Sequence, residues 1–175
     1  MVVVHSGCAG TQRKYMAALQ EQQPIARVRE VLPDGSVLLT GRNVRFRVLV
    51  LKPGFLLMIA KGGANGPEDK AAEIALLREF DIELERSGML TMFVDLREAT
   101  RMGGESRDIA VGWMRERQSR FNASHVLVRS KLMEMPISIV AMLVGGGIIK
   151  VYSRPQVFLE LLRQTAPKIT KLPTL

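Results

Sequence analysis

The run MLTMFVD, Met89–Asp95, is the first of three apolar stretches with the length and composition of β-strands. The other two are Ser124–Val128 (SHVLV) and Ile148–Ser153 (IIKVYS). Between them lie Gly104–Phe121, which has a periodic apolar face, and Met133–Val144, which is apolar almost all round. Parallel neighbouring strands need a long connection, usually a helix. The alternation therefore predicts an α/β fold, with Met89–Asp95 as a central strand buried on both faces.

The chain before residue 61 follows a different pattern. Ile25–Leu32 and Ser36–Thr40 alternate and flank Pro33-Asp34-Gly35, in which Pro presets φ and Gly accepts a positive φ. Val44–Val50 alternates again, and Phe55–Ala60 is an unbroken apolar run typical of a strand buried on both faces. The pattern predicts four short antiparallel strands before the sequence changes character at residue 61.

A long helix is expected to begin at Pro67 and to end at Gly88, because Pro is favoured in a first turn and Gly stops a helix. A glycine-rich loop, Gly62–Gly66, precedes it. This loop does not indicate a phosphate site, because it lacks the GxxxxGK[ST] order. Glu68 and Asp69 would also repel an anion at that helix start.

These elements predict a mixed sheet of four to five strands with helices mainly on one face, preceded by an N-terminal β extension. With 175 residues the chain is expected to form one main domain. Its parts are a poorly specified lead-in (1–24), a β-hairpin extension (25–43), the main α/β domain (44–165) and a tail (166–175).

The formal charge of +8 is concentrated at the front of the chain. Residues 1–66 carry nine Lys and Arg against three acids, whereas residues 67–175 carry sixteen against fourteen. Such an excess attracts nucleic acid or an anionic membrane surface. However, aromatic residues make up only 5% of the chain, and no base-stacking platform, recognition helix or zinc finger is visible. A solvated basic face is favoured, nucleic acid is not expected, and a membrane surface is a less favoured partner.

The cysteine and histidine residues, together with the apolar segments, bear on the cellular compartment of the protein and on its possible metal binding or catalysis. Cys8 is the only cysteine, which favours a reducing compartment and excludes an intramolecular disulfide. Met1–Ala9 lacks the basic region of a signal peptide, and no segment approaches the ~20 apolar residues of a membrane span. We therefore expect a cytoplasmic protein. His5, His125 and Cys8 lack ligand or catalytic spacing, so no metal, cofactor or enzymatic activity is expected.

The order of elements resembles a known family. Asp95-Leu96-Arg97 follows the central strand, Val126-Leu127-Val128 forms the next strand, and Ile149–Ser153 leads through Arg154-Pro155 into the helix Gln156–Leu162. In these features the chain is similar to STAS-type domains, the sulfate-transporter and anti-sigma-factor-antagonist fold, and to the related STAS/CRAL-TRIO-like small bacterial proteins. The likeness covers residues 44–165. It implies a regulatory or scaffold module that acts through protein–protein interaction.

The resemblance also directs attention to a phosphorylation switch. Phosphorylatable anti-sigma antagonists place an Asp-Ser pair after the central strand, where a kinase modifies the Ser. Here the corresponding stretch is Thr100–Ser106 (TRMGGES), which contains no such pair. Thr100 and Ser106 are the remaining candidates for phosphorylation. Ser106 is more simply explained as a helix-start residue that bonds backbone N–H groups.

A partner is expected to bind at the loop after the central strand. This loop lies at the carboxyl end of the sheet, where binding sites in α/β folds collect. Its charges alternate in sign, which suits electrostatic selection of a partner, and Gly103-Gly104 gives it backbone freedom. Alternatively, Asp95 only caps the loop through Arg97 or backbone donors. The candidate partner-binding residues are Asp95, Arg97, Glu98, Arg101, Glu105 and Arg107.

The segment Met133–Val144 has too few polar positions for an ordinary surface helix. One hypothesis is self-association into a homodimer, because large exposed apolar patches usually mark interfaces. The alternative is burial under the N-terminal strands. A second function is a small-molecule or lipid carrier with an apolar pocket between this Met-rich helix and the sheet. The candidate self-association residues are Met133, Met135, Ile139 and Met142.

Overall fold

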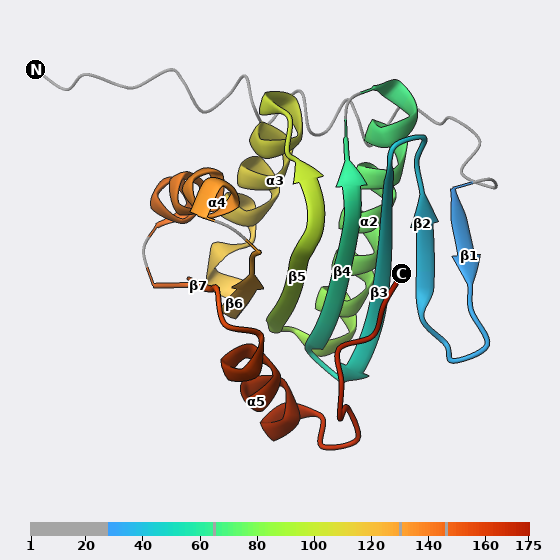
Figure 1. Ribbon diagram of the computed structural model, residues 1–175, viewed down its shortest axis with the longest axis vertical. Coiled ribbons are helices and arrows are strands. Elements are labelled where there is room, and N and C mark those ends of the chain that lie inside the picture. The colour runs from blue at the N-terminus through green and yellow to red at the C-terminus, as the bar shows by residue number, and fades with distance from the viewer. Residues whose placement is uncertain (1–27, 65, 130, 146) are drawn as a thin grey trace, which may run out of the picture.

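A mixed sheet of seven strands, ordered β1 to β7 as in the chain, organises the described residues (Figure 1). The computed structural model describes residues 28–64, 66–129, 131–145 and 147–175. Strands β1 to β4 pair antiparallel, and β4 to β7 pair parallel. The strands are β1 (Arg29–Val31), β2 (Val37–Thr40), β3 (Val44–Lys52), β4 (Phe55–Gly63), β5 (Leu90–Arg101), β6 (Phe121–Leu127) and β7 (Ile149–Tyr152).

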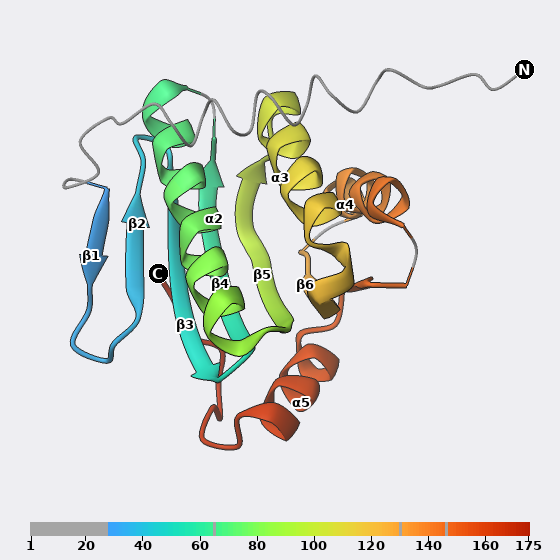
Figure 2. The same ribbon diagram turned by 180° about the vertical axis from the view of Figure 1, so that it is seen from behind.

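The helices follow the parallel strands one by one and lie on both faces of the sheet. They are α2 (Pro67–Ser87), α3 (Gly104–Glu116), α4 (Lys131–Val144) and α5 (Pro155–Thr165). The helices α2, α3 and α4 pack on one face, and α5 packs on the other (Figures 1 and 2). The α/β class and the change from antiparallel to parallel pairing after the N-terminal strands are as predicted from the sequence.

Strand β5 lies between β4 and β6, and its residues from Leu90 to Leu96 are buried without interruption. Their side chains alternate between two cores: Met92 and Val94 face α2 and α3, whereas Phe93 faces α5. The prediction of a central strand buried on both faces is confirmed from Leu90 to Asp95, whereas Met89 precedes the strand and is 39% exposed. The strand continues to Arg101, beyond the predicted end, because its backbone keeps pairing with β4.

The strand count and the one-face arrangement of helices in the predicted sheet are wrong. The predicted N-terminal hairpin extension is continuous with the main sheet, because β2 pairs with β3 and places Val37 opposite Val48. The sheet therefore has seven strands in the described ranges, where four or five were predicted. The second difference is that the face opposite α2 is also covered, by α5 and by the residues that follow it.

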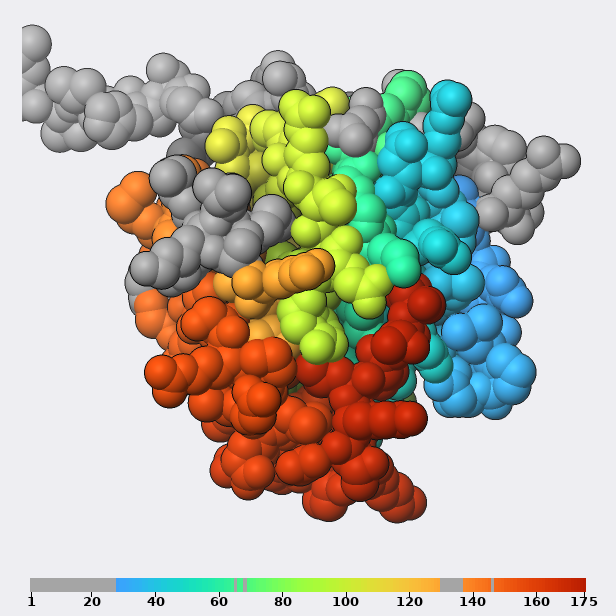
Figure 3. All heavy atoms as spheres, in the orientation of Figure 1, coloured from blue at the N-terminus to red at the C-terminus, as the bar shows by residue number. Residues whose placement is uncertain are grey.

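The C-terminal residues pack on the α5 face of the sheet, where the sequence indicated only a tail. Phe158 and Leu162 of α5 are fully buried. Beyond the helix, Ile169, Leu172 and Leu175 are half-buried against the same core. Arg47 of β3 donates a hydrogen bond from Nη1 to the Thr174 carbonyl at 2.9 Å. The space-filling view shows this segment lying across the sheet (Figure 3).

The ends of α2 and α3 show how local sequence determines helix length. Helix α2 has its predicted bounds, and Gly88, at φ 81°, donates its N–H to the Leu84 carbonyl at 2.9 Å. Helix α3 ends at Glu116, five residues before the predicted end, and a 3₁₀ turn, Gln118–Arg120, follows. Phe121 then begins β6 and packs edge-on against Trp113, with ring centroids 5.3 Å apart.

Helix α4 is the most apolar helix, but it contains only 14 residues. In the parts of the chain that the structure describes, no helix combines the length and apolar character needed to cross a membrane. The predicted lead-in, residues 1–24, which includes Cys8 and His5, lies outside the described ranges.

Candidate binding surface and cavity

Asp95 is held by its neighbour and is not available to a partner. Its side chain is 2% exposed, and both carboxylate oxygens accept hydrogen bonds from the Arg97 guanidinium, at 2.9 Å from Nε and 2.8 Å from Nη2. The Arg97 backbone N–H donates to the same carboxylate at 3.1 Å. This is the capping role that the sequence offered as the alternative for Asp95. The Arg97 guanidinium is in turn occupied by Asp95, and this pairing raises the pKa of Arg97.

The other predicted partner-binding residues lie at the end of β5 and in the first turns of α3, at the top of Figure 1. They do not form a loop, because β5 runs to Arg101 and α3 begins at Gly104. We call residues 98–108, which include these candidates and their neighbours, the β5–α3 surface. Its exposed members are Glu98, Thr100, Arg101, Gly104, Glu105 and Asp108, with Arg107 half-buried beside them.

The β5–α3 surface carries single ion pairs at its exposed charges. Lys61 Nζ lies 2.8 Å from Glu98 and lowers the pKa of that carboxyl. Lys70 Nζ lies 2.9 Å from Glu105. Such exposed pairs contribute about 0–1 kcal/mol each, because water screens them. The ion pairs can therefore open at little cost when another charged surface approaches.

The two phosphorylation candidates differ in their environment. Thr100 is exposed on β5, whereas Ser106 is half-buried in the first turn of α3. The Ser106 hydroxyl donates to Glu73 Oε2 of α2 at 2.9 Å. The helix-start role predicted for Ser106 is wrong, because the N-cap position belongs to Gly103, which makes no side-chain cap. Ser106 instead joins α3 to α2.

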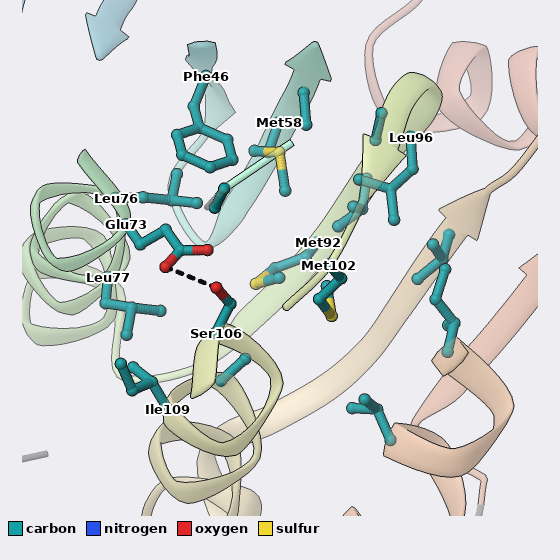
Figure 4. Close-up of a pocket in the computed structure, with 18 of the residues that line it drawn as sticks. Phe46, Met58, Glu73, Leu76, Leu77, Met92, Leu96, Met102, Ser106 and Ile109 are labelled. Atoms are coloured by element: carbon teal, nitrogen blue, oxygen red, sulfur yellow. Dashed lines mark hydrogen bonds between the residues drawn. The ribbon is translucent and has the colours of Figure 1, made fainter. Parts of the chain in front are cut away.

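A cavity of about 170 Å³ lies between the sheet and the helices on its α2 face (Figure 4). Its lining is mainly apolar, and α2 and α3 contribute most of the helical side chains. The Met-rich helix α4 supplies only Ile137 and Val140, so the cavity is centred away from the predicted pocket. Its apolar lining residues include Phe46, Met58, Leu76, Met92, Met102 and Trp113.

Glu73 is a half-buried ionisable group in the lining of this cavity. Burial is the main cause that raises its pKa to about 7, and the charges of Asp69 and Glu105 act in the same direction. The Ser106 hydrogen bond and the charge of Lys70 partly offset these effects. In Figure 4 one carboxyl oxygen meets Ser106, and the other points into the cavity.

Sequence reasoning missed Glu73, although one signal was present. Glu73 precedes Leu76, Leu77 and Phe80 by three, four and seven residues, so it falls within the apolar stripe of α2. All three of these side chains are buried. An acid within such a stripe indicates a carboxyl that faces the core. The sequence does not indicate which hydroxyl group or cavity this carboxyl contacts.

His125 has a structural environment on the α5 face. Its ring stacks on Phe93 with centroids 5.0 Å apart, and its Nδ1 lies 2.9 Å from the Tyr152 hydroxyl. Burial lowers the pKa of its imidazole. Asp95 pairs across the sheet with Leu127, not with His125. Among the described residues, no three His, Cys, Asp or Glu side chains are grouped so that they could hold a metal ion.

Helix α4 buries one side and exposes the other. Ile137, Val140 and Val144 are buried, whereas Met142 is 74% exposed and Ile139 also reaches solvent. The alternative of burial under the N-terminal strands is wrong, because α4 packs against α3 and β7 while β1 forms the opposite edge of the sheet. The side chains of the other two self-association candidates, Met133 and Met135, lie outside the described part of the structure.

Comparison of the sequence with protein-family models and with curated proteins gives no significant match.

Proposed function

We propose that the chain is a non-enzymatic, STAS-like regulatory or scaffold module of the cytoplasm, which acts by binding another protein. The order of elements supports this proposal, because four parallel strands are each followed by a helix from β4 to α5. The observation that carries it is the β5–α3 surface, an exposed set of charges at the carboxyl end of the central strand. Binding sites in α/β sheets collect at this end.

The charges of the β5–α3 surface suit selection of a partner more than stability of the fold. Lys61 with Glu98 and Lys70 with Glu105 are exposed pairs, and Arg101 is exposed beside them. A partner with complementary charges gains electrostatic attraction and a faster association rate. A partner with the wrong pattern is rejected by like charges. Regulation through an Asp-Ser phosphorylation switch is not part of the proposal.

The partner is best tested with Arg101→Glu. Arg97 is unsuitable, because its replacement would leave the buried Asp95 carboxylate without its cation and destabilise the fold. The matched control is Lys168→Glu, an exposed residue of the C-terminal segment. Affinity capture from the source organism should lose one specific protein with Arg101→Glu and retain it with Lys168→Glu. Retention of that protein by Arg101→Glu would place the interface elsewhere.

Homodimerisation through α4 is a further part of the proposal. Its exposed apolar side chains, including Met142 and Ile139, lie on the helix side that faces away from α3 and the sheet. Light scattering after size exclusion should give a dimer for the native chain and a monomer for Met142→Glu. Because Met142 is largely exposed, this change should leave the melting temperature within a few degrees of the native value.

A carrier of small apolar molecules is the second candidate function, and the cavity of about 170 Å³ is the observation that favours it. Native mass spectrometry distinguishes the two candidates, because a carrier retains extra mass that is lost on mild activation. A partner-binding module without a ligand gives the mass of the chain or of its dimer.

A further inference from the structure

We propose that the cavity binds a small apolar amine, whose ammonium group pairs with the Glu73 carboxylate while Ser106 positions that carboxylate. This inference rests on the carrier function and specifies the chemistry of its ligand.

The size of the cavity restricts the ligand. An engineered apolar cavity of about 150 Å³ takes up benzene, and the cavity here measures about 170 Å³. A six-carbon chain or one aromatic ring is therefore the appropriate apolar part. The walls around it include Phe46, Met58, Met92 and Trp113, which offer dispersion contacts but no hydrogen bonds to a chain.

The charge at the polar end favours a cation. Asp69 already accepts two hydrogen bonds from Asn43, at 2.7 and 3.0 Å, and Glu105 is paired with Lys70. Glu73 is bonded through one oxygen to the Ser106 hydroxyl, while its other oxygen points into the cavity. An ammonium group there would compensate a carboxylate that the apolar walls cannot solvate.

An anionic ligand would meet the opposite situation. Its charge would lie beside Glu73, with Asp69 and Glu105 close enough to raise the pKa of that group further. Arg101 also contributes to the lining, but it is an exposed residue at the rim. Water screens a charge at such a position, so Arg101 does not reverse the preference for a cation.

The exposure of the lining residues indicates the direction of binding. Where β5 ends and α3 is about to begin, the lining includes the exposed Arg101 and the half-buried Met102. Further along α3 and on β6 it includes Trp113 and Val126, which are 1% and 5% exposed. The apolar part of the ligand therefore enters first, and the amine remains at the end where α2 and α3 begin. Methionine side chains such as Met102 adapt readily to such an entry.

The experiment uses the full chain at pH 8 with three probes of equal chain length: hexylamine, hexanol and hexanoate. At this pH Glu73 is ionised, and an alkyl ammonium, with a pKa of about 10, is charged. Trp113 is the only tryptophan and lines the cavity, so its fluorescence reports occupancy. Calorimetry gives the affinities. We expect hexylamine to bind at least tenfold more tightly than hexanol, and hexanoate to bind more weakly than either.

Two variants identify the site. Glu73→Gln should remove the preference for hexylamine while hexanol still binds, and Glu85→Gln, an exposed residue of the same helix, should retain it. If hexanol binds but hexylamine is not favoured, or if Glu73→Gln keeps the preference, the assignment of the ligand is wrong and the carrier function remains. If none of the three probes binds, both the carrier function and this inference are wrong.

Discussion

Glu73 should make the protein less stable as the pH rises from about 4.5 to 7. In the unfolded chain its carboxyl has a pKa near 4.5, whereas in the folded chain burial raises the pKa to about 7. Between these values the unfolded state has lost the proton and the folded state retains it. Because the folded state binds more protons in this window, its free energy of unfolding decreases with pH.

The magnitude follows from the two pKa values. The difference between about 7 and 4.5 is about 2.5, and each pKa unit corresponds to about 1.36 kcal/mol. Ionisation of Glu73 should therefore cost about 3 kcal/mol once the pH is above 7. Glu73→Gln keeps an acceptor for the Ser106 hydroxyl but cannot ionise, so this cost should disappear.

Urea denaturation followed by Trp113 fluorescence, at pH values from 4.5 to 8, measures the effect. The quantity of interest is the difference between Glu73→Gln and the native chain, because His125 changes stability over part of this range in the other direction. Its lowered folded pKa means that stability falls as the pH drops below its unfolded pKa of about 6.5. Asp34 and Glu98, with lowered pKa values, act only under more acidic conditions.

The expected result is a near-zero difference at pH 4.5 that increases to about 3 kcal/mol in favour of Glu73→Gln above pH 7. Glu85→Gln should track the native chain throughout. A constant difference across the range would refute the reasoning, because it would show that Glu73 titrates alike in the folded and unfolded states.

Two further changes test contacts that hold the elements in place. Asp81→Ala removes the acceptor of the Trp113 Nε1–H, 2.9 Å away, and of Arg117 Nε, 2.6 Å away. It should lower the free energy of unfolding by about 2 to 4 kcal/mol in urea. Gly62→Ala would place a Cβ 2.0 Å from the Asn43 carbonyl oxygen at φ 84°, and it should lower the melting temperature well below that of Gly35→Ala. The latter has a similar φ of 79° but open space around the added carbon, and it should cost only about 1 kcal/mol.

The parts of the fold that sequence predicted correctly are those determined by local signals. Helix α2 has its predicted bounds because Pro67 and Gly88 mark its ends, and β5 is central because its apolar run is long enough to be buried on both faces. Where a helix passes into a strand without Gly or Pro, as between Glu116 and Phe121, the boundary was missed.

The cavity and its polar pair depend on contacts between distant segments. Glu73 and Ser106 are 33 residues apart, and Asp81 and Trp113 are 32 apart, and each pair joins α2 to α3. No periodicity within one helix reveals which residue of the next helix it will face. The packing of residue 175 and its neighbours on the sheet was missed for the same reason, because their apolar spacing does not identify the surface they cover.

Several methionines of the chain line the cavity. Among the described residues, Met58, Met92, Met102 and Met114 all line it, and they come from β4, β5, the connection after β5, and α3. An unbranched methionine has three rotatable bonds and repacks around an irregular shape, whereas a β-branched side chain is fixed at χ1. In the proposed site the apolar walls therefore adapt to ligands of different shape, and selection falls to the Glu73 carboxylate. Charge, more than the outline of the apolar part, should then decide which small molecules bind.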